Sequence, residues 1–413
     1  MIVLDNENFQ RVEKHIIKSN NPCYNMLMDF CRRSKDLYNH ANYLIREEFI
    51  KSGKWLRMND IDIILKDDTE FPDYRNMPTA QSAQQLLRLL DKNWKSFFAS
   101  IKDWSKHKEK YLGRPKMPKY LKKNGYYILI LTNQNCKLKD NILCFPKVFS
   151  GLTLLPHFIN RDDFKSFQQV RFIPHRNKIV VELIYRIVPP VQNDNNNRYV
   201  GIDIGIDNLM TVCNNIQEQA IIINGKPLKS INQFYNKKKA YYTKVCKQMN
   251  NLDYSKRLDR LTEKRNLKIE DYLHKASRFV VDYCETNDIN TVVIGKNDEW
   301  KQKSKLSKRV NQNFIQIPFV RLIEMIQYKA EERGIAVILT EESYTSGTSF
   351  IDNEEPVKEY YNKSRRIKRG LFKSNNGTMI NADLNGAYQI LKKVFPIKWD
   401  SGCALHPVVV DVA

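Results

Sequence analysis

The sequence predicts an α+β protein built from two domains, and three observations support that prediction. The chain has 413 residues, of which 42% are hydrophobic and 11% aromatic, so it can bury more than one core. The run PPVQNDNNN (189–197) joins two prolines to a polar, Asn-rich stretch that cannot form a core element, which indicates a linker. The order of helix-like and strand-like segments changes across this linker. We therefore expect one domain at 1–190 and a second at 198–413.

In the first domain, helix-like and strand-like segments are separated along the chain. The spacing predicts helices over 24–50 and 79–107, because in the second of these the apolar residues recur at three- and four-residue steps. Strands are expected over 126–132 and within 169–188. We expect a small β-barrel or sheet that carries a helical insertion at about 22–110.

The second domain begins with three short strand-like segments, at 198–205, 209–213 and 220–223, which are close enough in sequence to form antiparallel hairpins. A highly charged stretch, 231–288, then predicts a long helical insertion (about 230–288). Its apolar residues form one stripe: Phe234, Tyr241, Val245 and Leu252.

The rest of the second domain predicts a βαβ unit followed by a final helix. Strands at 291–294 and 335–340 flank a helix at 317–333, so the two strands should be parallel with a right-handed crossover. The last helix is expected at about 382–395. Three antiparallel strands, two parallel strands and flanking helices make up the plan of an RNase H-like domain.

The charge of the chain favours nucleic acid as a partner. Lys and Arg number 68 against 46 Asp and Glu, which gives a net charge of +22. Self-repulsion on that scale is best tolerated where a polyanion neutralises it. A generally lysine-rich proteome is the alternative explanation.

The chain shows no sign of a membrane or secreted protein. Its start, MIVLDNENFQ, has no basic-then-apolar signal segment, and no run reaches the roughly 18 apolar residues of a membrane span. The eight cysteines are scattered without any C-x-x-C spacing, which argues against a zinc site and a secreted disulfide framework. We expect a cytoplasmic protein with reduced thiols and no membrane partner.

Asp203 lies in the first strand of the second domain, within GIDIGIDNLMTV (201–212). On a strand, Asp203 shares its face with Gly201 and Gly205, so a metal ion and a phosphate could approach it. The alternative is an aspartate beside a turn made by Gly205 and Asp207.

Asp383 lies in the first turn of the last helix, within INADLNGAYQIL (380–391). Asn381 can cap this helix, and the helix dipole favours a negative charge there, which alone could explain Asp383. Yet Asp383 also shares a face with Gly386 and Ala387. Small residues let the helix lie close to the sheet and bring the carboxylate towards the strand ends.

Glu341 and Glu342 directly follow the strand expected at 335–340. Sites in open α/β sheets form at the carboxyl ends of strands, although an acidic pair in a loop can simply be solvated. Two-metal phosphodiester hydrolysis needs three or four carboxylates from separate elements, which hold two Mg²⁺ roughly 3.5–4 Å apart. Asp203, Glu342 and Asp383 lie on three separate elements of this kind.

The second half of the chain resembles the TnpB (OrfB-type) proteins of bacterial insertion sequences, which are relatives of the type V CRISPR nucleases. The resemblance rests on the two segments quoted above and on VVIGKNDEWKQ, NQNFIQIPF, YKAEERGI, EESYTSGTSFID and RRIKRGLFKS, whose order and spacing cover about 198–396. The first half agrees chiefly in layout and in GRPKMPKY (113–120). The resemblance implies a RuvC-type, RNase H-like nuclease domain, preceded by a β-barrel wedge domain with a helical recognition insertion.

The resemblance also implies partners and an activity. A guide RNA would read a double-stranded DNA target by base pairing, while the protein reads backbone shape and a short adjacent motif. Asp203 matches the first RuvC carboxylate and Asp383 the last. We therefore expect an RNA-guided DNA endonuclease of this transposon-encoded family that uses two Mg²⁺ held by Asp203, Glu342 and Asp383, whether the copy is transposon-borne or CRISPR-associated.

Two departures from the family pattern affect these expectations. The usual middle glutamate ends the strand VVIG, where Gly295 or a neighbour now stands and cannot ligate a metal through a side chain. Some family members supply the carboxylate from the following strand, and Glu342 fits that arrangement better than Glu341 or Glu299. The usual zinc-binding cysteines after the YTS motif are missing, so we expect no zinc.

The basic segment SRRIKRGLFKS (364–374) precedes the last helix. It is interpreted as a lid in which Arg369 or Lys373 meets a phosphate near the metals, since Arg binds phosphate bidentately and Lys acts as a point charge. A solvated surface loop is the alternative.

Three functions remain open at this point. The first is the endonuclease, and the second is a nuclease-inactive, RNA-guided DNA-binding regulator that has lost its middle ligand. The third is a non-guided resolvase or a structural RNA-binding protein. The first two differ in whether the Glu342 carboxylate reaches Asp203 and Asp383, and the third would co-purify with no RNA of defined sequence.

Overall fold

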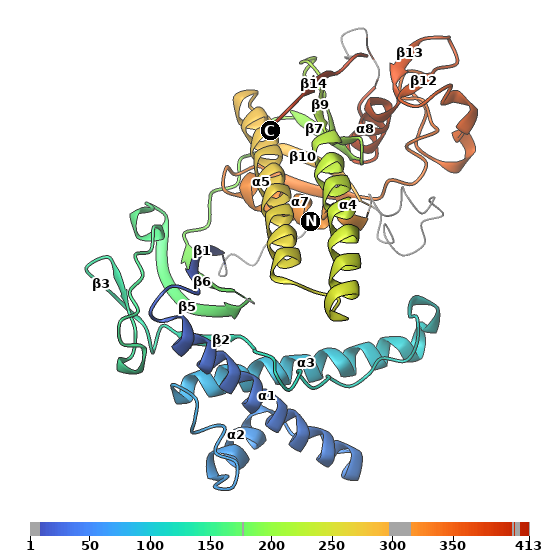
Figure 1. Cartoon of the computed structure of the whole chain (residues 1–413). Helices are drawn as coiled ribbons and strands as arrows, with labels where there is room; N and C mark the ends of the chain where they lie inside the picture. Colours follow the sequence, from blue (N-terminus) through green and yellow to red (C-terminus); the bar gives the residue numbers. More distant parts are fainter. Residues whose placement is uncertain (1–8, 176, 297–314, 399, 401–404, 413) are drawn as a thin grey trace. The chain divides into compact units, whose positions relative to one another are not determined.

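The computed structural model describes residues 9–175, 177–296, 315–398, 400 and 405–412 (Figure 1). Contacts divide the chain into two compact units, Met1–Pro189 and Pro190–Ala413. The division falls inside the Pro- and Asn-rich run that the sequence indicates as a linker. In the part of the chain that the structure describes, no helix combines the length and apolar character needed to cross a membrane.

The first unit holds three helices between its first two strands: α1 (Tyr24–Ser52), α2 (Met58–Asp67) and α3 (Ala80–Lys106). The predicted helices 24–50 and 79–107 are confirmed as α1 and α3, whereas α2 was not predicted. Thr79 begins α3, because its side chain accepts a hydrogen bond from the backbone N–H of Ser82. Gly53 ends α1 with a φ of 73°, the left-handed conformation that glycine adopts most easily.

The sheet of the first unit is antiparallel, with strand order β1-β6-β5-β2. Its strands are β1 (Gln10–Lys18), β2 (Leu129–Thr132), β5 (Phe164–Pro174) and β6 (Lys178–Ile187), and a separate hairpin pairs β3 (Lys137–Lys139) with β4 (Ile142–Cys144). The segment 169–188 therefore contains parts of two strands. Among the described residues β1 and β2 are the edges of an open sheet, so the β-barrel stays a prediction.

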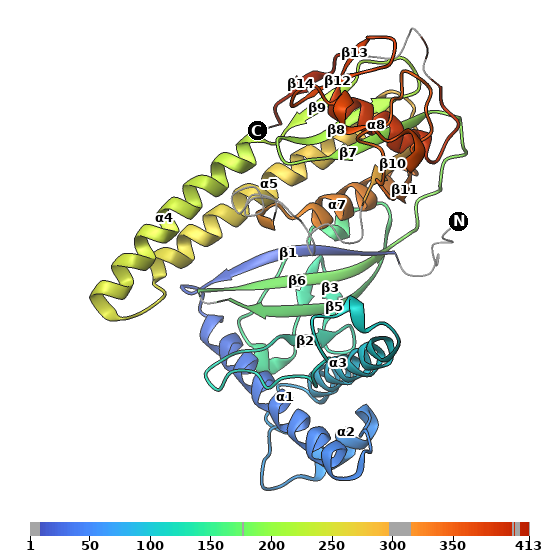
Figure 2. The same ribbon diagram turned by 90° about the vertical axis from the view of Figure 1, so that its right-hand side faces the viewer.

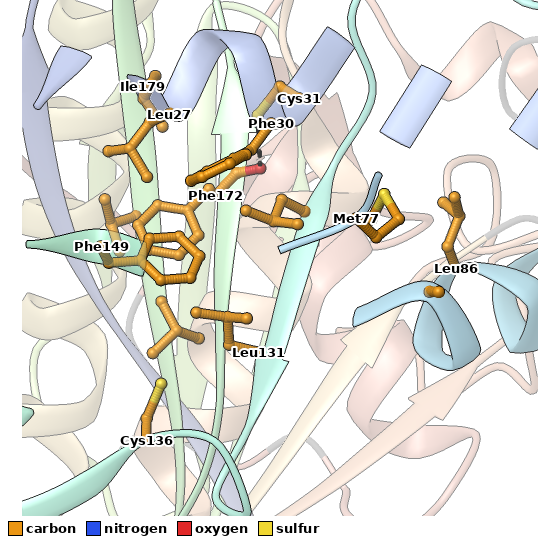
Figure 3. Packing of buried hydrophobic residues seen from close by; sticks show 14 of the residues in the cluster. Leu27, Phe30, Cys31, Met77, Leu86, Leu131, Cys136, Phe149, Phe172 and Ile179 are labelled. Atoms are coloured by element: carbon orange, nitrogen blue, oxygen red, sulfur yellow. Dashed lines mark hydrogen bonds between the residues drawn. The ribbon is translucent and has the colours of Figure 1, made fainter. Parts of the chain in front are cut away.

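The core of the first unit lies between α1 and this sheet (Figure 3). Leu27, Phe30 and Cys31 of α1 face Phe149 and Phe172, whose rings stack with their centroids 6.2 Å apart. Burial of these large apolar side chains holds the helical insertion against the strands.

The sheet of the second unit has the order β11-β10-β7-β8-β9-β14. Its strands are β7 (Tyr199–Ile204), β8 (Asn208–Asn214), β9 (Ile221–Asn224), β10 (Thr291–Gly295), β11 (Ala336–Thr340) and β14 (Val408–Val410). Strands β7, β8 and β9 are antiparallel, and β10 and β11 continue the sheet in parallel with β7. The predicted three antiparallel and two parallel strands are confirmed, and β14 was not predicted.

Helices cover both faces of this second sheet (Figure 2). They are α4 (Lys226–Asn250), α5 (Lys256–Thr286), α7 (Phe319–Glu331) and α8 (Ala382–Lys392), and a small hairpin pairs β12 (Leu371–Lys373) with β13 (Met379–Asn381). Apolar residues of α5 and α7 pack on one face of the sheet, and those of α8 pack on the other. Val200 and Ile202 of β7 point to the face covered by α5 and α7. The side chains that alternate with them, including Asp203, therefore point to the face covered by α8.

The helical stretch expected at 231–288 is not one helix. It breaks after Asn250, where Asn251 adopts the left-handed conformation with a φ of 51°, and α5 begins after Ser255. The apolar residues expected to form one stripe there are not a buried face, because three of them are exposed: Phe234 at 59%, Tyr241 at 60% and Leu252 at 42%.

Candidate active site

Asp203 points from β7 towards α8, and two glycines let the helix come that close. A Cβ atom at Gly201 would lie 2.6 Å from the Ala387 carbonyl oxygen, and a Cβ atom at Gly386 would lie 2.9 Å from Asp203 Oδ2. Both distances are shorter than a real contact allows. A side chain at 201 would clash with backbone, and one at 386 would displace the Asp203 carboxylate. The close approach of α8 to the sheet, predicted from its small residues, is confirmed.

Asp383 is fixed at the start of α8 by its cap and by two side chains. The Asn381 Oδ1 atom accepts hydrogen bonds from the backbone N–H groups of Asp383 (3.0 Å) and Leu384 (3.1 Å). Asn208 Nδ2 donates to Asp383 Oδ2 over 2.7 Å, and Arg366 Nη2 donates to Asp383 Oδ1 over 3.0 Å. The carboxylate is therefore held by β8 on one side and by the basic segment on the other.

Glu342 occupies the space next to Gly295. Gly295 of β10 pairs with Thr340 of β11. The residue before it, Ile294, pairs with Ile202 of β7, so Gly295 is level with Asp203. A Cβ atom at Gly295 would lie 2.7 Å from Glu342 Cγ and 2.8 Å from Glu342 Oε1. The glutamate side chain thus takes the place that a side chain at 295 would have taken.

The two weaker candidates for the third carboxylate do not share this place. Glu341 is exposed, whereas Glu342 is half-buried. Glu299 lies outside the described residues. Of the acidic pair after β11, the structure therefore brings Glu342 to the cluster.

A cavity of about 850 Å³ brings the three carboxylates together. Asp203, Glu342 and Asp383 line it, and the basic segment contributes Arg366, Lys368 and Arg369 to its wall. Of the two predicted phosphate contacts, Arg369 lines the cavity and forms an ion pair with Asp207, whereas Lys373 is exposed and is not among the lining residues.

The sequence did not identify Asn208 and Arg366 as parts of this site. Arg366 lies in the same basic run as Arg369. Which residue of that run reaches Asp383 depends on how the 363–370 segment folds back to α8. Asn208 lies five residues after Asp203, and only the hairpin from β7 to β8 brings it to Asp383. Neither feature has a distinguishing sequence signal.

The electrostatics of the cluster favour a cation. Burial, followed by the nearby carboxylates of Glu342 and Asp383, raises the pKa of Asp203 well above its usual value, while Arg366 opposes the increase. A divalent cation would relieve that repulsion, and carboxylate oxygens are the ligands that Mg²⁺ prefers. Among the described residues, no three His, Cys, Asp or Glu side chains are arranged to hold an ion as they stand. The donor chemistry fits Mg²⁺, and the side chains would have to turn to share an ion.

Comparisons with known proteins match separate parts of the chain. Residues 181–301 match the OrfB_IS605 family model, described as a probable transposase, and residues 319–390 match the model of the Cas12f1-like TNB domain. A comparison with curated protein sequences gave no match.

A solved structure shows the same fold. The chain is similar to the protein of a cryo-EM structure of the Cas12f1-sgRNA-target DNA complex, with a TM-score of 0.57 and 16% identity over 88% of this chain and 82% of that one. The structure of the mini-RNA-guided endonuclease CRISPR-Cas phi3 is also similar, with 11% identity over 97% of this chain and 94% of that one, but its TM-score of 0.47 is too low to support an argument.

The two family models lie on the parts of the chain that build the cavity, from β7 to β10 and from α7 to α8. These two matches agree with the likeness of the chain to TnpB-like (OrfB-type) proteins and to their type V nuclease relatives.

Proposed function

We propose that the protein is an RNA-guided DNA endonuclease that cleaves its target next to a short adjacent motif by two-metal phosphodiester hydrolysis. The observation that carries the proposal is the position of Glu342, whose side chain occupies the space beside Gly295 and lines one cavity with Asp203 and Asp383. Three carboxylates from β7, the end of β11 and α8 are what two Mg²⁺ require of a protein.

In this proposal the second unit is the RuvC-type, RNase H-like nuclease domain. Its three antiparallel strands, its two parallel strands and the carboxylates at the ends of β7 and β11 support that assignment. The first unit would be the wedge domain, with α1, α2 and α3 as the recognition insertion. The protein would act in the cytoplasm, where its guide RNA is made.

The chemistry divides between the ions and the chain. Mg²⁺ bound by Asp203, Glu342 and Asp383 would supply an activated water and charge stabilisation at the leaving oxygen. Asn208 holds the Asp383 carboxylate in place through its 2.7 Å hydrogen bond. Arg366 and Arg369, which now pair with Asp383 and Asp207, are placed to exchange those partners for phosphate oxygens of the DNA.

Charge and the comparison structures support guide RNA and double-stranded DNA as the partners. The solved Cas12f1 structure is a complex with sgRNA and target DNA. The net charge of +22 suits a chain that neutralises many phosphates of an RNA and a DNA at once.

A nuclease-inactive, RNA-guided DNA-binding regulator is the second candidate. It is favoured by Gly295 at the usual ligand position and by the ion pair of Arg366 with Asp383, which supplies a positive charge without a metal. This candidate and the nuclease make opposite predictions for cleavage.

We expect the purified protein to carry an RNA of defined sequence and to cut DNA that matches it. The RNA should be sequenced, and cleavage of a matching duplex should be measured with Mg²⁺, with EDTA and with a mismatched duplex as the control. Cleavage should require both the match and the metal. Guided binding without cleavage in any divalent cation would establish the regulator, and the absence of a defined RNA would refute both guided functions.

We also expect no stoichiometric zinc in the protein. In the described part of the second unit the cysteines are Cys213, Cys246 and Cys284, which lie on β8, α4 and α5, and two of them are buried. Thiolates on separate elements do not supply the four-ligand geometry of a structural zinc. Elemental analysis of the dialysed protein should find far less than one zinc per chain, and about one zinc per chain would reveal a site assembled from distant residues.

A further inference from the structure

Helix α4 concentrates the positive charge of the second unit. Its 25 residues include seven lysines and no acidic residue. Helix α5, which packs beside it, carries six acidic residues against eight Lys or Arg, so its charges nearly balance. A helix with no compensating acid on it is a candidate surface for a polyanion.

The exposed side of α4 is opposite its buried side. Leu228, Asn232 and Tyr235 are buried, and they share one face at the 3.6-residue repeat of a helix. The residues half a turn away form a single line along the helix, and all of them are exposed. We call this line the α4 stripe: Lys226, Ser230, Gln233, Lys237, Tyr241 and Lys244.

The α4 stripe begins at the wall of the candidate active site. A second cavity, of about 480 Å³, is lined by the first residues of the stripe together with Lys229, Asp207 and Arg369. Asp207 and Arg369 also line the cavity of the three carboxylates. Asp207 pairs with both Lys229 and Arg369, so a row of basic groups leads from the carboxylates onto α4.

The chemistry of the stripe suits an unpaired nucleic-acid strand. Lysines contact phosphates, and an exposed aromatic ring such as Tyr241, at 60% exposure, offers a surface on which an unpaired base can stack. The bases of a duplex are already stacked and have no free face for such a ring. From Lys226 to Lys244 the stripe extends about 27 Å, at roughly 1.5 Å per residue, so it can follow several nucleotides.

We propose that the α4 stripe holds the single DNA strand that leads into the carboxylate cavity. This inference rests on the proposed function and says where the strand lies before it reaches Asp203, Glu342 and Asp383. Lys226, Lys237 and Lys244 bind its phosphates, and Tyr241 stacks on one of its bases.

The test compares two matched double variants. Lys237→Gln with Lys244→Gln removes two charges from the stripe, and Lys264→Gln with Lys268→Gln removes two exposed charges from α5. The protein with its co-purified RNA is titrated with a fluorescent oligo-dT, unrelated to the guide, at several salt concentrations. Loss of two phosphate contacts should lower the slope of log affinity against log salt by about 1.4 for the stripe pair, at roughly 0.7 per contact. The α5 pair should keep the wild-type slope.

Tyr241→Ala separates stacking from charge. It should weaken oligo-dT binding roughly tenfold while the salt slope stays unchanged, because stacking releases no counterions. Equal slopes for the two double variants, or a wild type that does not bind oligo-dT, would overturn the inference.

Guided cleavage by the same preparations distinguishes this inference from the proposed function. If the wild type binds oligo-dT through the stripe but never cleaves matching DNA, the proposed nuclease function is wrong and the inference about the stripe stands. If the wild type cleaves matching DNA but the stripe variants bind oligo-dT as the wild type does, only the inference about the stripe is wrong.

Discussion

Asp203→Ala is expected to abolish metal-dependent cleavage, by at least about a thousandfold, while guided DNA binding stays near the wild-type level. The Asp203 carboxylate lines one cavity with those of Glu342 and Asp383, and both of them raise its pKa. Its removal leaves two carboxylates, which cannot hold both ions of a two-metal site. The phosphate contacts that support binding lie elsewhere on the chain, so they should survive.

The measurement pairs a single-turnover cleavage assay with a binding assay on the same guided complex. Thermal unfolding in EDTA provides the control for folding. Because the substitution removes a buried carboxylate that two like charges repel, the variant should unfold at the same temperature as the wild type or higher. Cleavage near the wild-type rate in a folded variant would remove Asp203 from the mechanism.

Glu342→Gln is expected to reduce cleavage by at least about a hundredfold, whereas Glu341→Gln should stay active. Glutamine keeps the shape that fills the space beside Gly295 but loses the charge that an ion needs. Glu341 is exposed and provides a control with the same chemical change one residue away.

Single-turnover cleavage of matching DNA, with saturating guide and Mg²⁺, distinguishes these two variants. A titration with Mn²⁺ adds a second measurement, because a lost ligand should raise the metal concentration needed for half-maximal cleavage. Normal cleavage by Glu342→Gln would refute the rearranged site. Loss of cleavage in Glu341→Gln, with normal cleavage in Glu342→Gln, would identify Glu341 as the third carboxylate instead.

Much of the second unit could be predicted from local pattern. The βαβ unit follows from two short apolar strands with a helix between them, and the cap at Asn381 fixes where α8 begins. Asp203 could be placed because alternation along β7 determines its face. Glu342 could be placed because parallel strands end at the same edge, and Gly295 leaves room there.

Tertiary contacts decided what the sequence could not. The α4–α5 break begins at Asn251, in a left-handed conformation, and ends at the cap residue Ser255. Phe234 and Tyr241 have the spacing of a core stripe, but α4 buries the opposite face, which includes the polar Asn232. Arg366 reaches Asp383 only because the chain folds back across 17 residues, and no periodic pattern records such a return.

The position of Glu342 changes what keeps the site rigid. A metal ligand at position 295 would belong to β10, whose backbone is hydrogen-bonded to β7 on one side and to β11 on the other. Glu342 stands beyond the last paired residue of β11, and a turn holds its backbone instead. The Glu342 carbonyl oxygen accepts hydrogen bonds from the Thr345 N–H (3.3 Å) and from Thr345 Oγ1 (2.9 Å). In the proposed site, a threonine that carries no charge would therefore help to preorganise the third carboxylate and to lower the entropic cost of assembling the site.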